Sequence, residues 1–85
     1  MATSAEKRAQ QKFGKSLKER RKAEGLSQTE LAEKASLDRT YVSELERGLK
    51  APGFHVLRRI ARALPVSADE LLSLAETPHK SQQAG

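Results

Sequence analysis

The sequence contains no cysteine and no tryptophan, and Phe13, Tyr41 and Phe54 are its only aromatic side chains. Without cysteine the chain can form neither a disulfide framework nor a thiolate metal site, which fits a reducing cytoplasm. Because aromatic side chains are so few, the core must be built from leucine, valine, isoleucine and alanine, and leucine and alanine favour helices. We therefore expect a small all-α bundle.

Long apolar segments and catalytic motifs are also missing. No apolar run approaches the roughly 18 residues of a membrane span, and we find no signal peptide, so we expect a soluble, cytoplasmic protein with no membrane partner. His55 and His79 are the only histidines and lack metal-ligand spacing, the five glycines form no phosphate loop, and no nucleophile motif frames a serine. We therefore expect that the protein is not an enzyme and that it binds no metal, no cofactor and no small-molecule substrate.

The length and the charge distribution limit the organisation of the chain. From its 85 residues we expect one small domain without room for a second. The formal net charge is +5, but residues 1–25 hold eight Lys and Arg against three Glu, whereas residues 26–50 hold four against five acidic residues, a net charge of −1. A polyanionic partner would therefore be attracted mainly by the first 25 residues.

The stretch from Leu26 to Gly48 has the strongest local signals. Ser27 followed by Glu30 is typical of a capping box that opens a short helix. The apolar face of this helix would consist of Leu31, Ala32 and Ala35.

A second helix start follows at Asp38, whose carboxylate can accept hydrogen bonds from backbone N–H groups. Val42 and Leu45 lie at i, i+3 spacing, and Gly48 can end the helix in the left-handed conformation. Two short helices joined by a turn of about three residues are typical of the helix-turn-helix unit, whose second helix can lie in a DNA major groove.

This segment resembles the lambda-repressor-like, or Cro-type (Xre), helix-turn-helix family. The likeness rests on the run Leu26-Ser27-Gln28-x-x-Leu31-Ala32 and on the ending Leu45-Glu46-Arg47-Gly48, and it extends from about Phe13 to about Leu74. It implies a compact five-helix DNA-binding domain over residues 6–76 with the motif at 27–47. Residues 1–5 and 77–85 are then expected to be a flexible N-terminus and a flexible tail.

Three further helices are expected around the motif. The first runs from Glu6 to about Glu24, before Gly25, with Phe13, Leu17 and Arg21 on one face. The fourth runs from Phe54 to Ala63, behind the weak cap Gly53, and ends there because Pro65 disfavours helix at Leu64.

Ser67 and Glu70 form another capping box, which predicts a last helix through about Ala75. Its leucines, Leu71, Leu72 and Leu74, cannot all face one way. Either Leu72 or Leu74 is left for a partner subunit, which would make this helix a dimer interface, or all three are buried within the monomer or at its edge.

The resemblance also implies two local features. In the family an arginine pairs with the glutamate of the Leu-Glu-x-Gly ending, which here implies a pair between Arg21 and Glu46. The family commonly has glycine with positive φ at the position of Ser36, where serine would cost on the order of 1 kcal/mol.

The second helix of the motif, from about Arg39 to Arg47, would present one polar face, with Tyr41 beside it. Arginine can bind guanine, threonine can touch a thymine methyl group, and glutamate can accept from cytosine. Glu44 could instead repel wrong sequences or orient Arg39 or Arg47. At Gln28 the resemblance implies a phosphate contact and a brace for the recognition helix. The expected DNA-binding residues are Gln28, Arg39, Thr40, Ser43, Glu44, Arg47 and Lys50, and the alternative is an ordinary solvated face.

Taken together, these features predict a sequence-specific regulator of transcription that binds double-stranded DNA, as a homodimer on a near-palindromic operator. Domains of this length resemble phage Cro-type repressors and the controller proteins of restriction–modification systems. Two alternatives stay open: an antitoxin of a toxin–antitoxin pair, and a protein–protein interaction module that has lost specific DNA binding.

Overall fold

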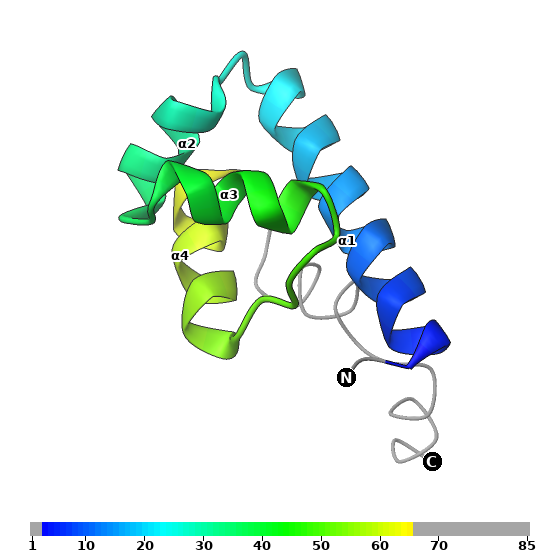
Figure 1. Ribbon diagram of the computed structural model, residues 1–85. Helices are drawn as coiled ribbons and strands as arrows, with labels where there is room; N and C mark the ends of the chain where they lie inside the picture. The colour runs from blue at the N-terminus through cyan, green and yellow to red at the C-terminus, as the bar shows by residue number, and fades with distance from the viewer. Residues whose placement is uncertain (1–2, 66–85) are drawn as a thin grey trace, which may run out of the picture.

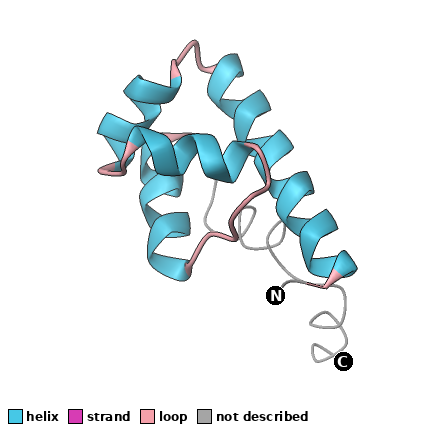
Figure 2. Ribbon diagram, in the orientation of Figure 1, coloured by secondary structure: helices cyan, strands magenta, loops and turns pink. Residues whose placement is uncertain are grey.

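The computed structural model describes residues 3–65, which form helices and connections without a strand (Figures 1 and 2). In chain order the helices are α1 (Ser4–Ala23), α2 (Gln28–Ala35), α3 (Arg39–Glu46) and α4 (Phe54–Ala63). The all-α prediction is confirmed for the described residues. The predicted fifth helix, with Ser67, Leu71, Leu72 and Leu74, and the predicted tail at 77–85 lie outside the described residues, so the predicted count of five helices stays a prediction.

Helix α1 begins at Ser4, two residues earlier than expected. The Thr3 side chain accepts a hydrogen bond from the Glu6 N–H at 3.1 Å, and the Glu6 carboxylate accepts from the Thr3 N–H at 2.7 Å. This capping box was not identified from the sequence, and Ser4 and Ala5, which the prediction left outside the first helix, are helical. At the other end the helix stops as expected, with Gly25 at a φ of 72°.

The connection between α2 and α3 follows the expected local rules. Ser27 and Glu30 form the predicted capping box, and the Asp38 carboxylate accepts from the Thr40 N–H at 3.2 Å. Ser36 adopts the left-handed conformation, with φ 57° and ψ 44°. Its carbonyl accepts a hydrogen bond from the Arg59 guanidinium of α4 at 3.2 Å, which ties the strained turn to the next helix.

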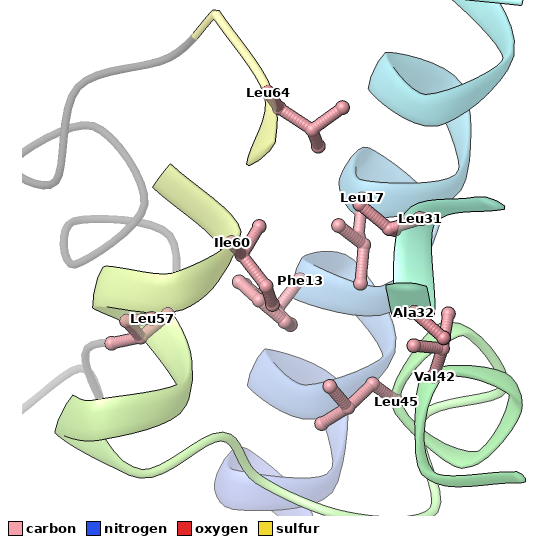
Figure 3. Close-up of a cluster of buried hydrophobic side chains, with 9 residues drawn as sticks. All are labelled: Phe13, Leu17, Leu31, Ala32, Val42, Leu45, Leu57, Ile60 and Leu64. Atoms are coloured by element: carbon pink, nitrogen blue, oxygen red, sulfur yellow. The ribbon is translucent and has the colours of Figure 1, made fainter. Parts of the chain in front are cut away.

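The core collects side chains from all four helices (Figure 3). After α4 ends at Ala63, Leu64 turns to an extended backbone with φ −119° and ψ 152°, as expected for a residue that precedes proline, and its side chain is buried. The buried cluster consists of Phe13, Leu17, Leu31, Ala32, Val42, Leu45, Leu57, Ile60 and Leu64.

Helix α1 lies against the C-terminal end of α3, while α2 packs on both α3 and α4 (Figure 1). At Gly14 the backbones of α1 and α3 lie so close that a Cβ atom on this residue would overlap the carbonyl oxygens of Leu45 and Glu46. A Cβ at Gly48 would come within 2.7 Å of Gln11 in the same region. Backbone therefore meets backbone where α1 crosses the end of α3, and this contact fixes the position of α3.

Candidate nucleic-acid interface

Helix α3 has one buried side and one outward side. Val42 and Leu45 are fully buried in the core, and Glu46 is buried as well. The predicted contact residues lie on the outward side, where Arg39, Thr40 and Arg47 are exposed and Ser43 and Glu44 are half-buried. Tyr41 is half-buried and packs against the core. The structure therefore places five of the seven predicted site residues on one continuous surface of α3 and its C-cap.

The sixth, Gln28, is the first residue of α2 and contacts α3 through its side-chain amide. Its Nε2 donates to Glu46 Oε1 at 3.0 Å, and its Oε1 accepts from Arg39 Nη1 at 3.4 Å. Because a carboxylate can only accept, the NH₂ group must face Glu46, and the carbonyl oxygen must therefore face Arg39. The amide thus braces Arg39 from one side, with a bond to Arg39 that is long and correspondingly weak.

Behind this amide lies the ion pair that the resemblance implied. Arg21 Nε and Glu46 Oε2 are 2.6 Å apart, and Arg21 Nη2 donates to Glu46 Oε1 at 3.0 Å. The remaining nitrogen, Arg21 Nη1, donates to the Leu26 carbonyl at 2.7 Å. Hydrogen bonding to Glu46 raises the pKa of Arg21 above its ordinary value despite its burial, so the arginine stays charged.

The seventh predicted residue, Lys50, lies in the connection after α3. Its ammonium is 3.5 Å from Glu44 Oε1 and 6.0 Å from the centre of the Tyr41 ring. The interpretation that Glu44 orients Arg39 or Arg47 is not what the structure shows, since the Glu44 carboxylate pairs with Lys50. Tyr41 was not among the predicted site residues, and its proximity to Lys50 could not be seen from the spacing alone.

Helix α1 carries more positive charge than any other helix of the described residues. Its lysines and Arg8 form an exposed stripe on the side of the helix that faces away from the core. The basic residues of this stripe are Lys7, Arg8, Lys12, Lys15, Lys18 and Lys22. Because α2 and α3 each hold more acidic than basic residues, long-range attraction of phosphate has to come mainly from α1, with the exposed Arg58, Arg59 and Arg62 of α4 adding to it.

Residues 3–65 contain no group of three or more acidic, histidine or cysteine side chains that could hold a metal ion. Within the same range, no helix is both long enough and apolar enough to cross a membrane.

Comparison with known proteins identifies the same segment. The family model described as helix-turn-helix matches residues 17–71. The transcriptional regulator SinR of Bacillus subtilis is 36% identical over 74 residues, covering 86% of this chain and 64% of SinR. An uncharacterized HTH-type transcriptional regulator of Mycobacterium tuberculosis is 40% identical over 58 residues, covering 68% of this chain and 41% of that protein. The chain therefore spans less than two thirds of the length of either curated relative.

Among solved structures, the restriction–modification controller protein C.AhdI from Aeromonas hydrophila is similar over most of its length. It has a TM-score of 0.70 and 42% sequence identity, and the match covers 73% of this chain and 94% of C.AhdI.

Proposed function

The chain belongs to the helix-turn-helix family, and from this premise we propose that it is a DNA-binding regulator of transcription that acts as a homodimer on a near-palindromic operator. The observation that carries the proposal is the outward face of α3 and its C-cap, on which five of the seven predicted contact residues lie together while Val42 and Leu45 anchor the helix in the core. A helix held in this way can enter the major groove as a rigid unit.

In this proposal the residues of the face have distinct roles. Arg39 binds guanine O6 and N7, Thr40 touches a thymine methyl group, and Ser43 and Glu44 face the remaining base edges. Arg47, Lys50 and the backbone N–H of Gln28, at the positive end of α2, contact phosphates. The brace from Gln28 supports this assignment for Arg39, because a partly immobilised guanidinium loses less conformational freedom on binding.

A homodimer is the assembly that a domain of this size favours. One helix-turn-helix reads only a few base pairs, so useful specificity needs a second copy about one helical turn away on the duplex. The predicted interface through Leu71, Leu72 and Leu74 lies outside the described residues and stays part of the proposal. The proposed location is the cytoplasm, and the proposed role involves binding without catalysis.

The experiment is a selection of bound sequences from a random duplex pool, run in parallel with the wild type and with Arg39→Ala at one moderate salt concentration. We expect enrichment of a near-palindrome, with one position in each half relaxed in the variant. Sedimentation equilibrium should show a dimer on the selected duplex. A pool without any enriched sequence would exclude specific reading and direct attention to a protein partner.

A further inference from the structure

The side chains of Glu44, Lys50 and Tyr41 form a small assembly at one edge of the outward face of α3. The Lys50 ammonium is held by two groups of α3 at once, the Glu44 carboxylate at 3.5 Å and the Tyr41 ring at 6.0 Å from its centre. The Glu44 side chain is 26% exposed and that of Lys50 is 54% exposed, so solvent and a docked ligand can reach both charges. Lys50, which we propose to bind a phosphate, is thus paired with Glu44, which we propose to contact a base.

The charges of this assembly depend on each other near DNA. Within α3, Glu46 is buried against Arg21, so Glu44 is the carboxylate that would meet the strongly negative potential of a duplex. If Lys50 moved from Glu44 to a phosphate, the negative charge of the Glu44 carboxylate would lack a positive partner while it lay close to other phosphates. Only a new hydrogen-bond donor can replace Lys50, and in the major groove the donor suited to a carboxylate is the N4 amino group of cytosine.

We propose that Glu44 is a specificity-determining residue that couples base reading to phosphate contact, an inference that rests on the proposed DNA-binding function. On a duplex that offers cytosine N4 at this position, Glu44 exchanges Lys50 for the base, and the released ammonium binds a phosphate. On other duplexes the Glu44–Lys50 pair stays closed and the phosphate contact is not made. Tyr41 keeps the released ammonium near the surface of α3, which shortens its path to the phosphate.

This coupling has a measurable signature in the salt dependence of binding. Each lysine that neutralises a phosphate releases condensed counterions and adds about 0.9 to the slope of log K against log salt. Specific binding should therefore have one more such contact per subunit than non-specific binding.

The experiment measures dissociation constants on the selected operator and on an unrelated duplex between about 50 and 200 mM salt. In Glu44→Gln, Lys50 is always available, so the slope on the unrelated duplex should steepen by about 0.9 per subunit. We expect the preference for the operator to fall roughly tenfold, the effect of losing one good base contact. The matched control is Glu33→Gln, which removes the same charge from an exposed position on α2 and should leave the slope unchanged.

Lys50→Gln gives the complementary result. For this variant, the slope of log K against log salt should become shallower by about 0.9 per subunit on the operator and stay unchanged on the unrelated duplex. Equal slopes for Glu44→Gln and Glu33→Gln on the unrelated duplex would overturn the coupling, as would a loss of slope in Lys50→Gln on both duplexes. These outcomes presuppose that the wild type selects an operator, whereas a wild type that selects none refutes the DNA-reading proposal itself.

Discussion

The guanidinium of Arg21 and the carboxylate of Glu46 face each other through two hydrogen bonds, of 2.6 Å and 3.0 Å, and join α1 to the last residue of α3. Both residues are buried, with 7% and 9% of their surface exposed. Gln28 adds a third donor to the same carboxylate, so the start of α2 is held there too. One buried anion therefore fixes the mutual positions of three helices.

Removing that anion should destabilise the protein strongly. Glu46→Ala leaves the Arg21 charge buried with only the Leu26 carbonyl as a partner, and we expect a loss of about 3 kcal/mol in the free energy of unfolding. Urea denaturation of the variant and of the wild type measures it. Glu33→Ala, at an exposed position of α2, should change stability by no more than about 0.5 kcal/mol. Equal effects in the two variants would show that the ion pair adds nothing to stability.

Gly14 tests the close contact between α1 and α3. On propensity alone Gly14→Ala should stabilise the helix interior by about 0.5–1 kcal/mol. The added methyl group would overlap two backbone carbonyls of α3, so we expect a net destabilisation of about 2 kcal/mol in thermal or urea unfolding. Ser16→Ala is the control, since it brings alanine into the interior of the same helix without adding an atom and should stabilise it slightly. A gain in stability for Gly14→Ala would mean that α1 and α3 lie further apart in solution.

Ser36 carries a stored backbone strain that glycine should relieve. Because its φ is 57°, we expect Ser36→Gly to raise the free energy of unfolding by about 1 kcal/mol while the Arg59 bond to its carbonyl is kept. The same substitution at Ser16, inside α1, should destabilise by a similar amount because helical backbone disfavours glycine. If urea unfolding shows stability changes of opposite sign for the two variants, the backbone conformation of Ser36 is the cause. A loss of stability in both variants would contradict this explanation.

The capping box of α2 should lose its effect in acid. Hydrogen bonds from the Ser27 backbone and side chain lower the pKa of Glu30 from its ordinary value of 4.5. A lowered pKa means that the ionised carboxylate stabilises the folded state above pH 4.5 and that this contribution disappears as the pH falls through the folded-state pKa. Glu30→Ala should therefore lower the unfolding midpoint at neutral pH and lower it less in acid. If the difference in unfolding midpoint between the wild type and Glu30→Ala did not depend on pH, the loss of stability would be due to helix propensity and not to the capping box.

Local rules in the sequence were sufficient for much of the fold. The Ser27–Glu30 capping box, the Asp38 cap, the end of α4 before Pro65 and the outward face of α3 each depend on a few neighbouring residues. The Thr3–Glu6 box obeys the same rule and could have been found. A glycine within a run of strong helix formers is also a recognised signal of close packing, and at Gly14 it was not used.

What the sequence could not provide are contacts between separate helices. The Arg21–Glu46 pair was reached only through the resemblance, because the residues are 25 positions apart. The partner of Glu44 depends on where the connection after α3 places Lys50, and no periodicity encodes that position. The orientation of the Gln28 amide follows from the hydrogen bond that its NH₂ group donates to Glu46, and only the assembled structure reveals that contact.

Gln28 leads to the last prediction, which separates its two expected roles. Gln28→Met keeps the length of the side chain but removes the donor to Glu46 and the acceptor for Arg39. If the side chain acts by bracing Arg39, operator affinity should fall about fivefold, corresponding to about 1 kcal/mol for one hydrogen bond. Affinity for an unrelated duplex should stay nearly unchanged, because no base is read there.

The decisive measurement repeats this substitution in an Arg39→Ala background. A brace has nothing to hold once the guanidinium is gone, so Gln28→Met should then have almost no effect on operator affinity, and the double-mutant cycle should show a coupling of about 1 kcal/mol. If the Gln28 side chain binds a phosphate by itself, the fivefold loss persists without Arg39, and the two effects are additive. An additive result would assign Gln28 to the phosphate backbone and leave Arg39 oriented by the DNA alone.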